Sequence, residues 1–138
     1  MAPEQSWDER LEASDGIDIR PVPEGRRNMT PGKSMLYPSA RVVNDAILAI
    51  PEGQSVTPKE LRTLLANQHN ADYTCPVTTT MMLRVVAEAA NEAHRNGVPL
   101  IELTPIWRVL DKRAFALRKL TFDSGYFADQ RAREGLPA

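Results

Sequence analysis

Apolar residues recur at helical spacing in two stretches of the chain, and each stretch predicts an amphipathic helix. The first covers about 40–51, with Ser39 as its N-cap and a stop at Pro51. The second and longest covers roughly 76–95 and ends at Gly97. The apolar face of the first helix is Val42, Val43, Ala46, Ile47 and Ile50. The expected buried stripe of the second is Val77, Met81, Val85, Val86, Ala89, Ala90 and Ala93.

A short helix between these two is predicted by its start signal. Thr57 is a capping residue, Pro58 occupies the first helical position, and Glu60 completes a capping box. The helix should end near Asn67, with its core-facing side formed by Leu61, Leu64 and Leu65. A short helix, a polar loop and a long helix in this order follow the helix-turn-helix plan, in which the second helix is available to a DNA groove.

The last forty residues have weaker patterns. Residues 98–104 alternate loosely and predict an extended segment, and 107–110 predict a short strand-like run. A final helix is expected over about 127–133. Between them lies a basic stretch formed by Lys112, Arg113, Arg118 and Lys119. The whole pattern predicts a mainly α domain with a short β or extended wing.

Residues 1–33 predict a flexible acidic and proline-rich arm in front of a folded domain over 34–138. Prolines and glycines are frequent in this arm and large apolar side chains are few, so little surface can be buried to offset the entropy of ordering. One short helical turn around 7–11 would place Trp7 and Leu11 on the same side, where they can dock on the body or on a partner.

The composition is that of an ordinary globular protein, with 42% hydrophobic and 25% charged residues. We expect no membrane span, because no apolar run of about 18 residues occurs, and no signal peptide. The single cysteine excludes an internal disulfide, and two histidines are too few to predict a metal site or cofactor. A reducing, cytoplasmic location is therefore expected.

Charge is divided unevenly along the chain. Residues 1–24 hold seven acidic and two basic residues, a net of −5, and the remainder carries +4. A mildly basic body behind an acidic arm is compatible with nucleic-acid binding.

Four stretches, in order, resemble the DNA-binding domain of the alkylguanine-DNA alkyltransferases and their non-catalytic alkyltransferase-like relatives. Residues 43–53 are similar to the family's opening helix and "I-P-x-G" turn, and 56–61 to its first helix-turn-helix helix. Residues 84–90 are similar to its "R-A-V-G-x-A" recognition helix. Pro105-Ile106-Trp107-Arg108-Val109 stands where the family has its "P-C-H-R-V" active-site motif, and 130–135 are similar to its final helix.

This resemblance implies a small helix-turn-helix domain of winged-helix type. In the family, the recognition helix binds the minor groove of double-stranded DNA, an arginine enters the base stack, and a damaged base is flipped into a pocket. Arg84 is the matching candidate for the inserted arginine; alternatively it is a solvated arginine on a helix flank. Pro58 stands near the place of a family tyrosine that helps to rotate a phosphate, which weakens the expectation of base flipping.

The resemblance also implies that the chain is not an enzyme. The family transfers an alkyl group to a thiolate activated by an adjacent histidine, and Ile106 and Trp107 stand at those two positions. Neither side chain can accept an alkyl group. Both belong to the expected base pocket, where Trp107 either stacks on a flipped base or packs in the core.

Polar and basic residues around the predicted helix-turn-helix are candidates for contacts with DNA. Threonine hydroxyls at the start of the long helix can bind phosphate or serve as local caps. Cationic side chains can neutralise phosphates, which would make binding fall with salt. The predicted DNA contacts are Thr57, Lys59, Arg62, Thr78, Thr79, Arg84, Arg108, Lys112 and Arg113.

The sequence therefore predicts a non-catalytic protein that binds double-stranded DNA and recognises alkylated or distorted bases for repair. A first alternative is a protein-interaction module that kept the fold without DNA binding and uses residues 1–33 for a partner. A second alternative is an alkyl acceptor or redox protein that uses Cys75, the one available thiol, placed before a helix N-terminus that can lower its pKa. A free cysteine in this position can equally be a small buried residue.

Overall fold

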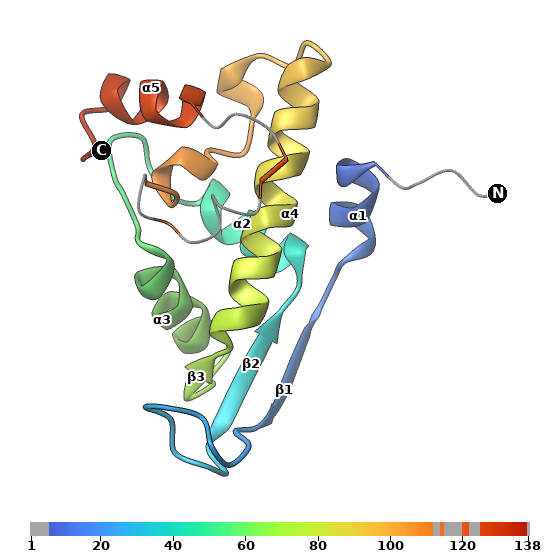
Figure 1. The fold of residues 1–138 in the computed structure, drawn as a ribbon, viewed down its shortest axis with the longest axis vertical. Helices are drawn as coiled ribbons and strands as arrows, with labels where there is room; N and C mark the ends of the chain where they lie inside the picture. The colour runs from blue at the N-terminus through green and yellow to red at the C-terminus, as the bar shows by residue number, and fades with distance from the viewer. Residues whose placement is uncertain (1–5, 112–113, 115–119, 122–124, 138) are drawn as a thin grey trace, which may run out of the picture.

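The computed structural model describes residues 6–111, 114, 120–121 and 125–137 of the chain. In these residues the chain forms five α-helices and one small three-stranded sheet, which lies at one edge of the molecule (Figure 1). The helices are α1 (Trp7–Ala13), α2 (Ala40–Leu48), α3 (Pro58–Gln68), α4 (Pro76–Arg95) and α5 (Gly125–Arg133), and the strands are β1 (Ile17–Pro21), β2 (Ser34–Pro38) and β3 (Tyr73–Thr74).

The long helix α4 is the centre of the fold, and α1, α2, α3 and the sheet all contact it. The three helices predicted between residues 40 and 95 are confirmed, together with their caps. The Ser39 hydroxyl accepts a hydrogen bond from the Val42 N–H at 3.2 Å. Both bonds of the capping box between Thr57 and Glu60 are present, at 3.1 Å each. Gly97 follows α4 with a φ of +94°, a conformation that favours glycine.

The predicted buried stripe of α4 is confirmed at Val86, Ala89 and Ala90, which are all buried. It is wrong at its start, where Val77 and Met81 are 59% and 56% exposed. Thr79 and Leu83 are almost completely buried there instead. Leu64 on α3 was also expected in the core and is 40% exposed.

The segment expected as a flexible arm contains ordered structure from residue 6 onward. The predicted helical turn near Trp7 is extended into α1, whose Leu11 is buried against the main core. Strand β1 pairs antiparallel with β2, from Ile17 opposite Pro38 to Pro21 opposite Ser34. The expected boundary at residue 33 therefore falls inside a β-hairpin. Backbone hydrogen bonds between β1 and β2 hold this segment against the rest of the protein, and amino-acid composition does not predict such bonds.

Two expected extended segments are instead single 3₁₀ turns, at Leu100–Glu102 and Ile106–Arg108. A proline precedes each turn, and its fixed φ suits the entry to a helical turn better than a paired strand. The basic residues Lys112, Arg113, Arg118 and Lys119 lie outside the described residues. No helix in the described part of the chain has the length and apolar character that crossing a membrane requires.

Candidate functional site

The 105–109 segment, where the resembled family has its reactive centre, is packed inside the protein. Ile106 is fully buried and Trp107 is 4% exposed. A surface groove of about 400 Å³ between the Leu100–Glu102 turn and α5 reaches one edge of Trp107. The expectation of a base pocket lined by Ile106 and Trp107 is therefore not met in this conformation, and Trp107 packs in the core instead.

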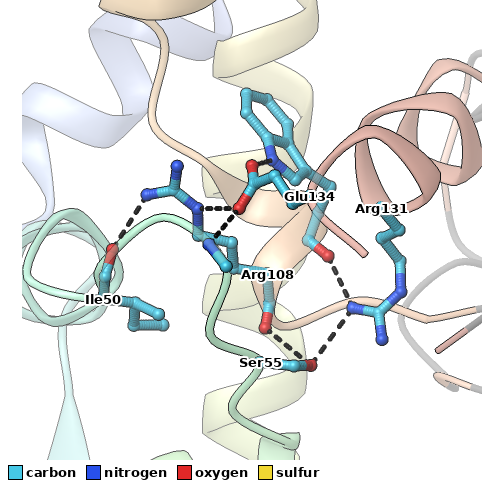
Figure 2. Close-up of polar contacts among 7 residues, drawn as sticks. Ile50, Ser55, Arg108, Arg131 and Glu134 are labelled. Carbon is cyan, nitrogen blue, oxygen red and sulfur yellow. Dashed lines mark hydrogen bonds and ion pairs between the residues drawn. The ribbon is translucent and has the colours of Figure 1, made fainter. Parts of the chain in front are cut away.

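Glu134, just after α5, holds this segment in place (Figure 2). Its carboxylate accepts the Trp107 indole N–H at 2.6 Å and the Arg108 Nε–H at 2.8 Å. It also accepts the Gly53 backbone N–H at 2.9 Å. Burial would raise the pKa of Glu134, but the hydrogen bonds from Arg108, Gly53 and Trp107 outweigh it and hold the pKa below its ordinary value. Glu134 is thus an anion with three donors.

Two arginines complete the same network. Arg108 Nη1 donates to the Ile50 carbonyl at 2.8 Å, so both ends of its guanidinium are engaged. Arg131, buried on α5, donates to the Trp107 carbonyl at 2.7 Å and to the Pro137 carbonyl at 2.6 Å. The prediction of Arg108 as a DNA contact is therefore not supported by its geometry. It joins the turn after α2 to the C-terminal segment.

Neither Glu134 nor Arg131 was singled out from the sequence. The apolar pattern does not detect charged residues in the interior, and Trp107, which both contact, lies 27 and 24 positions away along the chain. The only available signal was the similarity of 130–135 to the family's final helix. Chemically, this network has carboxylate, guanidinium and indole groups but no thiol, and its hydrogen bonds position the 105–109 segment.

Cys75 lies at the N-cap of α4, in a different part of the molecule. Its thiol is 2% exposed and accepts a hydrogen bond from the Thr78 hydroxyl at 3.4 Å. Burial raises the pKa of Cys75. Hydrogen bonds from Thr78 and Val77 and the charge of nearby Arg26 lower this pKa by more than burial raises it, so the net shift is downward. The residue has almost no contact with solvent.

The threonines at the start of α4 are occupied by the protein itself. Thr79 is fully buried and its hydroxyl donates to the Cys75 carbonyl at 2.8 Å, so it cannot contact a phosphate as predicted. Thr78 bonds the Cys75 thiol, and Thr57 caps α3. All three hydroxyls therefore make hydrogen bonds with residues three or four positions away.

One face of α4 remains open to solvent over its first half. Val77 and Met81, four residues apart, form an exposed apolar pair, and half-buried Thr80 and Arg84 flank it. On α3, Lys59 is exposed and Arg62 is half-buried. No ion pair of the described residues engages Lys59, Arg62 or Arg84. The structure thus brings Lys59 and Arg62 to one groove, whereas Arg84 lies against Trp7.

Arg84 also meets α1, which lies along α4 (Figure 1). The Trp7 ring lies between two guanidinium groups, 4.5 Å from Arg10 and 5.3 Å from Arg84. The backbone N–H groups of Trp7 and Asp8 donate to the Glu92 carboxylate on α4, at 3.1 and 3.3 Å. The buried Nε of Arg84 has no hydrogen-bond partner among the described residues. The candidate inserted arginine is therefore partly covered by α1 but not fixed by a polar contact.

No cluster of three potential metal ligands occurs among the residues with described positions. Searches against protein-family models, curated proteins and solved structures returned no match to this chain.

Proposed function

We propose that this chain is a non-catalytic DNA-binding protein that uses α4 as the recognition helix of a winged-helix-type domain and recognises alkylated or distorted bases in duplex DNA. The observation that carries the proposal is the open face of α4, where Val77 and Met81 are more than half exposed beside Arg84. Apolar side chains on a helix otherwise well packed indicate a surface that a partner covers.

The chemistry of this face suits a DNA minor groove. Proteins that enter this groove use apolar wedges between base steps together with arginine side chains. Met81 provides a flexible apolar side chain, and Arg84 lies three residues further on. A distorted or damaged step costs less to unstack, which would give preference for alkylated DNA.

The proposal includes no transfer reaction, and the 105–109 segment supports this part of it. Ile106 replaces the family's thiol and is buried, and Trp107 is held by Glu134. Binding without chemistry is the function this arrangement supports.

The test is fluorescence anisotropy with two matched duplexes, one of which contains a single alkylguanine. We expect binding to both at low salt and tighter binding to the alkylated duplex. Arg84→Ala should weaken binding about tenfold, whereas Arg95→Ala, at the other end of α4, should leave it unchanged. No binding to either duplex at low salt would overturn the proposal.

A second candidate is a protein-interaction module without DNA binding, which is favoured by the position of α1. Trp7 of α1 lies against Arg84, and the first turn of α1 carries the acidic residues Asp8 and Glu9, which would repel DNA that approaches this helix. Trp7→Ala separates the two functions. Under the proposed function, uncovering Arg84 should raise DNA affinity several-fold; under the alternative, neither the wild type nor this variant binds a duplex.

The alkyl-acceptor alternative depends on Cys75, which is 2% exposed. We expect the peptide that contains Cys75 to remain unmodified after incubation with alkylated DNA. Mass spectrometry provides the measurement, and a peptide carrying the alkyl mass would restore this alternative.

A further inference from the structure

The loop between β1 and β2, residues 22–33, is anchored at its base. The Val22 N–H donates to the Lys33 carbonyl at 2.7 Å, and the Gly32 N–H donates to the Val22 carbonyl at 3.0 Å. Val22 is 3% exposed and packs with Met35 and Cys75 in a small second core. The chain that leads into this loop is therefore held against the start of α4.

The tip of the loop is fixed as well. Asn28 has a φ of +61°, a left-handed conformation that asparagine tolerates in a tight turn. The Thr30 N–H donates to the Tyr73 hydroxyl at 3.2 Å, which lowers the pKa of Tyr73 and ties the loop to β3. In Figure 1 the loop lies at the end of the molecule where β3 also lies. It is thus positioned beside the connection between α3 and α4.

Basic side chains from two segments line a groove of about 490 Å³ at this place. Arg27 comes from the β1–β2 loop, and Lys59 and Arg62 come from α3. Of the described lining residues, Asp72 alone carries a carboxylate. Asp72 accepts from the N–H and hydroxyl of Ser34 at 3.0 Å each, and these bonds lower its pKa. Three cations against one carboxylate leave the groove positively charged.

None of the three cations is neutralised within the described part of the chain. No ion pair there includes Arg27, Lys59 or Arg62. The groove ends at Pro76, the first residue of α4, and the next residue, Val77, begins the open face. A duplex that covers the open face therefore brings its backbone toward the groove.

We propose that the β1–β2 loop is a wing that binds the DNA phosphate backbone, with Arg27 on one side of the groove and Lys59 and Arg62 on the other. This inference rests on the proposed function and adds a contact that precedes the helix-turn-helix in the chain. Arginine and lysine side chains that approach a phosphate release condensed counterions, so each contact appears in the salt dependence of binding.

The test measures the dissociation constant of an undamaged duplex by anisotropy at several salt concentrations. Arg27→Gln should weaken binding about fivefold at 0.1 M salt and reduce the slope of log K against log salt by about 1. Lys59→Gln should act alike, and the double variant should lose about 2 from the slope. Arg95→Gln makes the same charge change at the far end of α4 and should leave the slope unchanged.

The outcomes separate the two proposals. If the wild type binds and Arg27→Gln keeps its affinity and slope, the wing is wrong and the proposed function stands. If Arg95→Gln lowers the slope as much as Arg27→Gln does, the effect is one of net charge and the wing is also wrong. If the wild type binds no duplex, both proposals fall. Thermal melting should show all variants folded, because Arg27 and Lys59 side chains are exposed.

Discussion

Two charged regions of the molecule use similar side chains in opposite ways. Around Glu134, Arg131 is buried, and half-buried Arg108 and Glu134 form an ion pair with 15% and 7% side-chain exposure. Around the start of α4, Arg27, Lys59 and Arg62 face a groove without an ion pair among the described residues. Charged groups that satisfy one another stabilise the fold, whereas unpaired cations at a surface remain available to an anionic partner.

The 105–109 segment, where the resembled family has its reactive centre, belongs to the first of these regions. That region is a joint between the turn after α2, the 105–109 segment and the C-terminus. Substitutions there should change stability, and substitutions at the α4 surface should change binding. The following predictions test this division.

Glu134→Ala should give the largest effect, a loss of about 3 kcal/mol of unfolding free energy, because it leaves the largely covered Arg108 side chain without its counter-ion and Trp107 Nε1 without an acceptor. Urea denaturation gives the value, with Glu102→Ala, an exposed carboxylate, as the control. A loss below about 1 kcal/mol would show that the network is not a stabilising joint.

Acid should weaken the same joint. The pKa of Glu134 is lowered in the folded protein, so its stabilising contribution is present above the ordinary glutamate value and is lost as pH falls through the folded-state pKa. We expect a smaller decrease in stability on acidification in Glu134→Gln than in the wild type. Urea midpoints between pH 7 and about pH 3 supply the comparison; identical pH profiles would contradict it.

Thr57→Ala should cost about 1 kcal/mol, because the hydroxyl that caps α3 is removed and the Glu60 N–H loses its acceptor. Thr63→Ala, an exposed position within the same helix, is the matched control and should be nearly neutral. Thermal melting of both variants measures the difference, and equal melting temperatures would mean that the cap is dispensable.

Met81→Gln should have the smallest effect on stability, within about 0.5 kcal/mol, because the side chain is 56% exposed. Its effect on duplex binding should be a several-fold loss. Leu83→Ala, two residues away and buried, reverses the pattern and destabilises the fold. If Met81→Gln unfolds the protein or leaves duplex affinity unchanged, the two regions are not divided as described.

Local signals predicted the helices well. Ser39, the capping box at Thr57 and the glycine after α4 each act within a few residues, so their consequences could be inferred without the rest of the chain. The exposure of Val77 and Met81 could not be inferred, because their spacing continues that of Val86, Ala89 and Ala90, which are buried as predicted.

Long-range pairing escaped the sequence pattern. Strand β1 depends on β2, and its own side chains are exposed, so they show no apolar alternation. The candidate surface was predicted in part, through Lys59, Arg62 and Arg84. Arg27 was not predicted, because the loop that positions it depends on a buried Val22 and on Tyr73. Glu134, the hydrogen-bond partner of Trp107, was also not predicted, because it lies 27 residues further along the chain.

The position of Trp7 between Arg10 and Arg84 has an optical consequence. The chain has two tryptophans, and the other, Trp107, is buried with its indole N–H on a carboxylate. Trp107 emission should respond to unfolding of the joint, whereas Trp7 emission, from a half-buried ring, should shift when α1 leaves α4. Variants that keep only Trp107 would therefore report on unfolding around Glu134, without an added dye. Variants that keep only Trp7 would report on the separation of α1 from Arg84.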